Sequence, residues 1–388
     1  MVRGFLSSNI AGGRRRPAMR VSFIILLTVM FMASCQNNNP VTPPPEIKPP
    51  VGAKSIAVVM AAADYSSANF EIISANDYTT VSANLINGLH TDLAVRAFGA
   101  DVYILERFLK DNIIKYSTAN MAPAYQENLG IGLNIQDFAI ASESKAYISS
   151  HEDSDLIIFN PSAGKRVSTI DLSRFAAYAG TDSAEAQPFI GQLALHGNYL
   201  YAACQRLKIE QGPWGPAPAP GDTSLILVID TETDAVVREI RLNKKNPVAM
   251  SIHGDRMLVA SPGDWFDPAT GGIEVIDLAS NQNLGVKVEG ITLNVIFVSA
   301  NRAYMAEMSA DWTTGIIPFD PSTGTKGSKI TGIEDGSGGM AHDGEKLYAG
   351  DRGFGSAGIA VINTSTDAIE QKIPTSMPPA GLAIISAD

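Results

Sequence analysis

The sequence contains little cysteine and little positive charge, and both shortages exclude classes of protein. Only Cys35 and Cys204 occur in 388 residues, and without a Cys-x-x-Cys-His segment the chain lacks the site of covalent haem attachment. Lys and Arg number 29 against 40 Asp and Glu, which gives a net charge of −11. A nucleic-acid partner requires a basic stripe, and the only arginine cluster is Arg14–Arg16. We therefore expect no nucleic-acid binding.

Recognised catalytic motifs are missing as well. The chain has no G-x-S-x-G segment, no Walker loop and no His or Cys cluster with metal-ligand spacing. Turn formers and apolar residues are abundant instead: 34 Gly and 22 Pro accompany 45% hydrophobic residues. This mixture is typical of an all-β protein with many short strands.

An apolar run at 21–33, VSFIILLTVMFMA, follows Met19-Arg20. It is shorter than the ~20 residues of a membrane-spanning helix and fits a secretory signal. The closing Met32-Ala33-Ser34-Cys35 resembles the lipobox of bacterial lipoproteins. This resemblance implies a signal peptide over 1–35 and a lipid on its cysteine; an ordinary signal with an incidental cysteine is the alternative. Because Met19 is the more natural start, residues 1–18 are expected to be a start-site artefact.

Residues 36–54 are polar and rich in proline, which predicts an extended, semi-rigid tether. Gln36 resembles the residue that follows the cysteine in lipoproteins sorted to the outer membrane. The resemblance implies a lipid-anchored protein of the bacterial cell envelope, on either side of that membrane. Cys204 is then left without a partner, and its apolar surroundings in the sequence predict a small buried hydrophobe, so we expect no disulfide.

The stretch Ser224–Leu242, SLILVIDTETDAVVREIRL, carries the pattern of a β-hairpin. The apolar run Leu225–Ile229 and the alternating run Ala235–Leu242 flank the polar turn Asp230–Asp234. The residue that closes the apolar strand recurs at seven positions: Ser74, Tyr116, Asn160, Asp230, Asp277, Asp320 and Asn363. By subtraction they are 42, 44, 70, 47, 43 and 43 residues apart, and the long interval holds insertions at 173–187 and 211–222.

Two further apolar runs, joined by a short turn, precede these hairpins. They are clearest at 193–204, 249–261, 295–307 and 339–350. One unit therefore holds four strands in about 43 residues, which is the period of a β-propeller blade. The first unit begins at Ile56–Ala62 without a preceding strand, and Gly381–Ser386 is left over at the end. We predict an all-β, seven-bladed propeller over 55–388, closed when this last strand pairs into the first blade.

The segments LYAAC, MLVAS, AYMAE and LYAGD, with the following V-I-D-x-x-T, resemble the YVTN-type (YncE-like) seven-bladed propellers over residues 55–388. A WD40 propeller is a weaker interpretation because the Gly-His and Trp-Asp pairs are missing. Tandem β-sandwiches would not explain the regular period.

The four strands of each predicted blade run in alternating directions. The connection between the second and third strands and the connection to the next blade therefore lie on the same face of the propeller, which we call the loop face. These connections are long and variable, and function tends to lie in such loops. Exposed aromatic groups there would form a recognition surface, although each could instead cap its own blade. The predicted ligand-binding residues are Trp214, Trp265, Trp312, Phe266, Tyr65, Phe354 and Arg352. Phe175 and Tyr178 are further candidates, and Arg352 could meet a carboxylate or phosphate or form a surface ion pair.

Carboxylates on the same loops could converge on Ca²⁺. The candidate ligands are Asp64, Asp153, Asp264, Asp311 and Asp351. Asp is also favoured in turns, and this structural role is the alternative. His196, His253 and His342 occupy turns of the opposite face, and His151 is the only histidine expected on the loop face.

Three functions remain open. The first is an envelope protein that uses its loop face to capture a small molecule or partner; similar surface propellers bind corrinoids beside TonB-dependent transporters, so such a transporter or another envelope protein is the expected partner. The second is a protein–protein scaffold in envelope assembly. The third is a hydrolase or lactonase with a metal at the central funnel, which requires a coupled acid–base pair.

Overall fold

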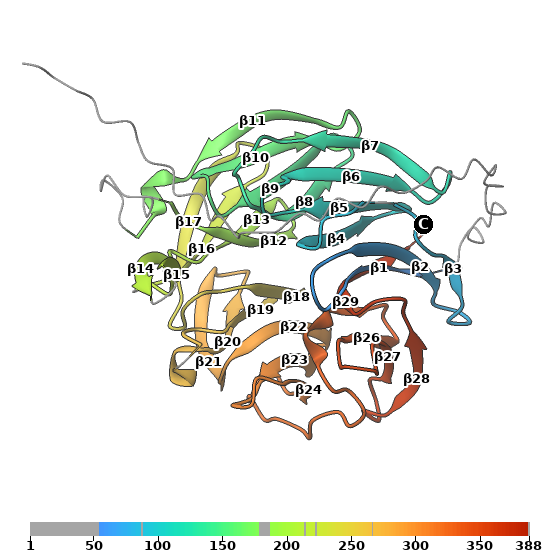
Figure 1. Ribbon diagram of the computed structural model, residues 1–388. Coiled ribbons are helices and arrows are strands. Elements are labelled where there is room, and N and C mark those ends of the chain that lie inside the picture. The colour runs from blue at the N-terminus through green and yellow to red at the C-terminus, as the bar shows by residue number, and fades with distance from the viewer. Residues whose placement is uncertain are drawn as a thin grey trace, which may run out of the picture. The chain divides into compact units, whose positions relative to one another are not determined.

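Short apolar or alternating runs between Gly and Asx turns fold into 29 strands in the part of the chain that the computed structural model describes (Figure 1). The described residues are 54–86, 88–177, 187–212, 215–221, 223–265 and 267–386. They belong to the unit Glu46–Asp388, which is distinct from Met1–Pro45. None of the helices in these residues is long and apolar enough to cross a membrane.

Twenty-seven of the strands form seven antiparallel sheets, one for each predicted blade, and the other two form a separate hairpin. The strands of each blade are given with the innermost first. Blade 1 contains β29 (Pro379–Ile385), β1 (Ser55–Ala61), β2 (Ala68–Ser74) and β3 (Thr80–Ser82). Blade 2 contains β4 (Leu93–Phe98), β5 (Asp101–Glu106), β6 (Asn112–Ser117) and β7 (Ala122–Asn128). Blade 3 contains β8 (Ile135–Ser142), β9 (Lys145–Ser150), β10 (Asp155–Asn160) and β11 (Lys165–Asp171).

The remaining blades repeat this order. Blade 4 contains β12 (Ile190–His196), β13 (Tyr199–Cys204), β16 (Leu225–Asp230) and β17 (Ala235–Arg241), with an inserted hairpin of β14 (Lys208–Gly212) and β15 (Gly215–Ala219). Blade 5 contains β18 (Ala249–His253), β19 (Arg256–Ser261), β20 (Gly272–Asp277) and β21 (Gln282–Glu289). Blade 6 contains β22 (Thr292–Ser299), β23 (Arg302–Met308) and β24 (Thr314–Phe319). Blade 7 contains β25 (Met340–His342), β26 (Lys346–Asp351), β27 (Gly358–Asn363) and β28 (Ile369–Pro374).

The outer edge of blade 6 is formed by the segment 326–330 in place of a regular strand. Gly327 N–H donates to the Pro318 carbonyl at 2.8 Å, and Ile330 N–H donates to the Ile316 carbonyl at 2.9 Å. Pro318 has no N–H to donate in return, so the hydrogen-bond ladder is interrupted at this residue. The segment still covers the blade, and the predicted seven-bladed propeller is confirmed.

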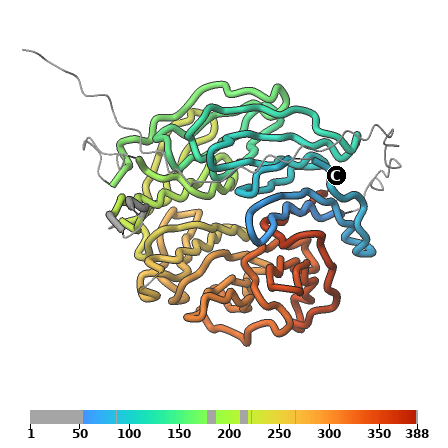
Figure 2. The backbone as a smooth tube through the Cα atoms, viewed as in Figure 1, coloured from blue at the N-terminus to red at the C-terminus, as the bar shows by residue number. Residues whose placement is uncertain are grey.

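The two ends of the propeller meet in blade 1. β29 pairs with β1 from Ser55 opposite Ile385 to Val59 opposite Gly381, with a register shift after Val59. Figure 2 shows the blue start of the propeller against its red end. The predicted closure by the last strand is therefore correct.

The apolar core lies between blades rather than inside any one of them. Seven clusters of buried residues occupy the seven blade interfaces. In β19, Met257 and Val259 pack toward blade 4, while Leu258 and Ala260 pack toward blade 6. Both faces of the second strand are buried, which is why these strands read as continuous apolar runs. Cys204 is fully buried in such a cluster, as predicted, and burial raises the pKa of its thiol to about 12.

A tyrosine of the second strand joins three of the blades to the next one. Its hydroxyl donates to an Asp or Asn in the outer turn of the following blade, where the Asx residue has the positive φ that Asx tolerates. The pairs are Tyr147 with Asp234 at 2.6 Å, Tyr201 with Asn281 at 3.0 Å and Tyr304 with Asp367 at 2.6 Å. The Tyr of LYAAC and AYMAE thus connects two blades, whereas Tyr348 of LYAGD donates to Asp343 of its own blade at 2.9 Å.

We expect Tyr147→Phe to lower the free energy of unfolding by about 1–2 kcal/mol, because a hydrogen bond to a carboxylate is lost between two blades. Urea unfolding followed by circular dichroism measures the change. Tyr199→Phe is the matched control, since Tyr199 is 38% exposed and is the first residue of β13 in the neighbouring blade. Equal losses in both variants would contradict the connecting role.

Candidate functional site

The centre of the ring contains a cavity of about 580 Å³. Most of its lining residues come from the first half of the innermost strand of every blade, or from just before it. Three others, Arg107, His151 and Gln205, follow the second strands of blades 2, 3 and 4. Because each innermost strand starts on the loop face, the cavity occupies the half of the central channel nearest that face. Seven chain segments far apart in sequence therefore contribute to one site.

Polar side chains from blades 2, 3 and 4 cross the channel wall. Arg96 pairs with Asp137 at 2.6 Å, and Asp137 also accepts the Leu193 N–H at 2.8 Å. Asp137 is only 1% exposed, so its charge is balanced by Arg96 and held by hydrogen bonds. The side-chain oxygen of Gln192 in blade 4 accepts the Met250 N–H of blade 5, which extends this polar wall to the next blade.

Two neighbouring groups in the wall have unmet hydrogen-bonding capacity. The Nε2 atom of His151 and the Oε1 atom of Gln205 are both buried, and neither has a partner among the described residues. Gln205 is held in place because its Nε2 donates to the Pro247 carbonyl at 3.2 Å. Both residues flank Phe189: its carbonyl accepts the Gln205 N–H at 3.0 Å, and its ring lies edge-on to His151 with centroids 6.1 Å apart. Buried polar groups are normally satisfied, so this pair marks a point where a bound molecule can add hydrogen bonds.

Burial lowers the pKa of His151 to about 4, and the positive charge of Arg107 adds to this shift, while Asp92 opposes it. His151 is therefore neutral at physiological pH. A neutral imidazole can either donate or accept a hydrogen bond at Nε2, depending on its tautomer.

A second cavity, of about 330 Å³, shares Leu93, Arg107, Ser337 and Ala380 with the first and forms its mouth. It brings together two residues predicted from sequence, Tyr65 and Arg352. The guanidinium of Arg352 donates to the Pro379 carbonyl at 2.7 Å and forms no ion pair within the described part of the chain. By contrast, Arg107 is paired with Asp92 at 2.5 Å. Arg352 thus keeps an uncompensated positive charge at the mouth.

The predicted aromatic residues lie on the loop face but are not gathered in one cavity. Tyr65, Trp265, Trp312 and Phe354 are 67%, 41%, 59% and 101% exposed. Only Tyr65 lines the mouth. Trp214, Phe266 and Tyr178 lie outside the described residues. Phe175 was expected on the recognition surface, but it is 5% exposed and belongs to the core between blades 3 and 4.

The predicted aspartates are held within separate loops. Asp351 is fully buried; burial alone would raise its pKa, but the Asp335 N–H and Lys372 hold that pKa below its ordinary value. Hydrogen bonds from Ser66 lower the pKa of Asp64, and bonds from Ser309 and Thr313 lower that of Asp311 to about 2. Asp153 accepts the N–H of Asp155 at 3.1 Å. The described residues include no group of three or more His, Cys, Asp or Glu that could hold a metal ion.

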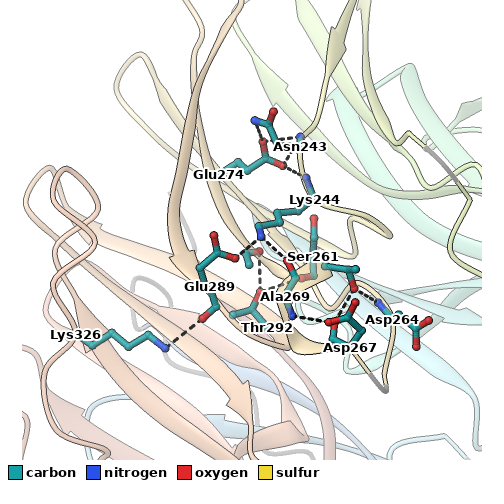
Figure 3. Close-up of polar contacts among 12 residues, drawn as sticks. Asn243, Lys244, Ser261, Asp264, Asp267, Ala269, Glu274, Glu289, Thr292 and Lys326 are labelled. Carbon is teal, nitrogen blue, oxygen red and sulfur yellow. Dashed lines mark hydrogen bonds and ion pairs between the residues drawn. The ribbon is translucent and has the colours of Figure 1, made fainter.

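The loop that carries Asp264 and Trp265 is fastened to blade 5 by a polar network (Figure 3). Lys244 donates to the Ala269 carbonyl at 2.7 Å and forms an ion pair with Glu289. The Asp264 N–H donates to the Thr270 hydroxyl at 2.7 Å. Trp265 is therefore displayed on a fixed loop.

The histidines differ from the prediction in one respect. His151 lies on the loop face as expected, but His90, between β3 and β4, lies there too. The backbone N–H of His90 donates to the Glu106 carboxylate at 2.6 Å. The connection between blades 1 and 2, which carries His90, is hard to identify from sequence because the fourth strand of blade 1 has only three residues.

Sequence reasoning missed Gln205, Arg96 and Asp137. A signal for two of them exists: Arg96 and Asp137 interrupt innermost strands with charge near the loop face. Gln205 directly follows the apolar strand β13, and no local sequence pattern distinguishes it from an ordinary polar residue at a strand end.

No known family model matches the chain, and no curated protein matches it. Solved structures match in fold. Hydrazine synthase from Kuenenia stuttgartiensis has a TM-score of 0.59 at 14% identity, covering 78% of this chain and 93% of that one. The dihydro-heme d1 dehydrogenase NirN in complex with DHE has a TM-score of 0.53 at 14% identity, covering 86% and 75%. U3-55K has a TM-score of 0.52 at 11% identity, covering 76% and 88%. At these identities the likeness extends to the fold alone, and the YVTN resemblance stays a prediction.

The low pKa of His151 predicts a pH-dependent loss of stability. The unfolded chain takes up this proton below about pH 6.5, whereas the folded protein resists it until about pH 4, so acidification across this range favours unfolding. We expect His151 to account for about 2 kcal/mol of destabilisation between pH 8 and pH 5.

Urea unfolding at both pH values tests this expectation. His151→Gln should reduce the pH dependence by that amount, while His253→Gln, at an exposed position on the opposite face, should leave it unchanged. An undiminished pH dependence in His151→Gln would refute the assignment.

Proposed function

We propose that this protein is a binding protein of the bacterial cell envelope that takes a small-molecule ligand into the loop-face half of its central channel. The observation that carries the proposal is the channel wall, where the buried His151 Nε2 and Gln205 Oε1 lack partners beside a cavity of about 580 Å³. Cavities of this size suit small molecules, and a few placed polar groups orient them.

The charges and aromatic groups around the mouth support the same proposal. Arg352 supplies a positive charge without an ion-pair partner in the described residues, and Tyr65 supplies an exposed ring beside it. A ligand that extends from the channel would meet both. Ligands that combine a polar body with an acidic group fit this arrangement.

The first described residue of the chain lies on the face opposite the loop face. Lys54, directly before β1, donates to the Asp343 carbonyl at 2.6 Å, and Asp343 lies in the turn between β25 and β26 on the opposite face. Lys54, the first described residue, thus lies at the face opposite the mouth. A lipid on Cys35 would anchor the protein to the outer membrane while a TonB-dependent transporter or another envelope protein approached the loop face.

The scaffold function remains a second candidate because of one observation. Large apolar side chains are exposed on the loop face well beyond the mouth: Phe108, Leu109, Ile131, Trp265, Trp312 and Phe354. Such residues are enriched in protein–protein contacts. A scaffold would use this surface and leave the channel empty. The metal-dependent hydrolase gains no support, since the predicted aspartates are held in separate loops of the described residues.

A ligand panel tests the channel. Corrinoids, haem, glycans and Ca²⁺ are added to the purified protein, and thermal unfolding and absorbance are recorded. A ligand at 100 times its Kd should stabilise the protein by ~2.7 kcal/mol. Ser337 is exposed and lines both the channel and its mouth. Ser337→Trp should therefore block the channel with its indole ring and abolish the ligand-induced rise in unfolding temperature.

Ser144→Trp, in an exposed turn of the opposite face, is the matched control and should keep the shift. No stabilisation by any compound would favour the scaffold. A shift that survives Ser337→Trp would place the ligand outside the channel.

The lipid anchor is tested separately. We expect Cys35→Ala to move the protein from the membrane fraction to the soluble fraction, because the only proposed attachment to the membrane is the lipid on this residue. Fractionation followed by immunoblotting measures the distribution, with Cys204→Ala as the control that stays in the membrane fraction. Retention of Cys35→Ala would refute the anchor.

A further inference from the structure

A third cavity, of about 350 Å³, lies between blades 3 and 4 and is lined by Arg174, Phe175, Arg206, Leu225, Glu239 and Arg241. Arg174 belongs to the short helix η1 (Ser173–Phe175) after β11, and Arg206 follows β13. Leu225 begins β16, and Arg241 ends β17. All of these positions are at the loop-face ends of their strands, so the cavity opens near that face and outside the central channel.

The charge of this cavity is unlike that of the rest of the protein. Three arginines face one glutamate, in a chain whose net charge is −11. Four other arginines are paired with carboxylates, among them Arg256 with Asp277 and Arg302 with Asp367. Within the described residues, none of the three cavity arginines forms an ion pair.

Two of the arginines are oriented by contacts other than an ion pair, although the charge of Arg174 contributes to the lowered pKa of Asp171 at the end of β11. Arg206 donates to the carbonyls of Thr223 at 3.1 Å and Ala176 at 3.4 Å, and its buried Nε has no acceptor in the described part of the chain. The guanidinium carbon of Arg174 lies 4.6 Å from the centre of the Phe175 ring. Carbonyl and ring contacts orient a guanidinium without neutralising it.

We propose that this cavity binds a phosphate-type oxyanion, as the free ion, on a soluble molecule or in a lipid headgroup. The lining residues, three arginines and one glutamate, carry a net charge of +2, and the local charge stays positive when Asp171 beside Arg174 is included, which favours an anion. Guanidinium groups recognise such oxygens through parallel charge-assisted hydrogen bonds. Because Arg206 is already oriented, little conformational entropy is lost when the anion binds. This site is separate from the channel, and either one can exist without the other.

Calorimetric titration of the purified protein with inorganic phosphate tests the proposal. Arg241→Gln and Arg206→Gln should each weaken binding about tenfold, the effect of losing one charge-assisted contact worth ~1.4 kcal/mol. Arg238→Gln is the matched control: it removes the same charge from the same strand, but its side chain donates to Ser280 and lies outside the cavity. Circular dichroism confirms folding, and Arg241, exposed at the end of an edge strand, is the variant least able to disturb it.

A second arm identifies the source of the phosphate. The Cys35→Ala protein, which lacks its own proposed anchor, is sedimented with vesicles of phosphatidylglycerol or of phosphatidylcholine. Binding to phosphatidylglycerol that Arg241→Gln abolishes supports a headgroup, and binding of inorganic phosphate alone supports a soluble molecule. The proposal is overturned if neither inorganic phosphate nor phosphatidylglycerol binds, or if Arg238→Gln weakens binding as much as Arg241→Gln does.

Discussion

The pairing of β29 with β1 is the interaction on which the propeller depends, because it supplies the innermost strand of blade 1 from the opposite end of the chain. It completes the apolar cluster between blades 7 and 1, in which Leu382 packs with Ile56 and Val58. It also provides residues 380–382 of the channel wall. Each blade buries both faces of its sheet only when it has a neighbour on each side, so an open ring would expose two apolar faces at once.

Buried carboxylates fix the loops around the channel once the ring is closed. Asp111 accepts the N–H groups of Gly132, Leu133 and Ile135 at 2.9–3.1 Å and so connects blade 2 to blade 3. Asp351 likewise connects blade 7 to the loop after blade 6, because it accepts the N–H groups of Glu334 and Asp335. A buried carboxylate is tolerated because several N–H donors surround it. The same chemistry that makes an aspartate a metal-ligand candidate in sequence can serve to hold loops together.

Both proposed binding sites lie where buried polar groups lack hydrogen-bond partners within the described residues. Gln205 and Arg206 are consecutive residues after β13, yet the first lines the central channel and the second lines the arginine cavity. Both retain a buried polar atom without a partner among the described residues. One short segment of blade 4, next to the inserted hairpin, thus contributes to both proposed sites.

The sequence by itself determined the number of blades, the strands and the closure, because period-two alternation and turn residues are local and repeat every 43 residues or so. The hairpin 224–242 is the outer half of blade 4, as its pattern predicts. The sequence also located Tyr65 and Arg352, whose loops fall on the variable face. Only the tertiary structure decided which polar residues meet: His151 and Gln205 are 54 positions apart by subtraction, and both contact Phe189 of blade 4, His151 from the neighbouring blade 3 and Gln205 from blade 4 itself. Convergence of this kind depends on how blades pack, which no local pattern encodes.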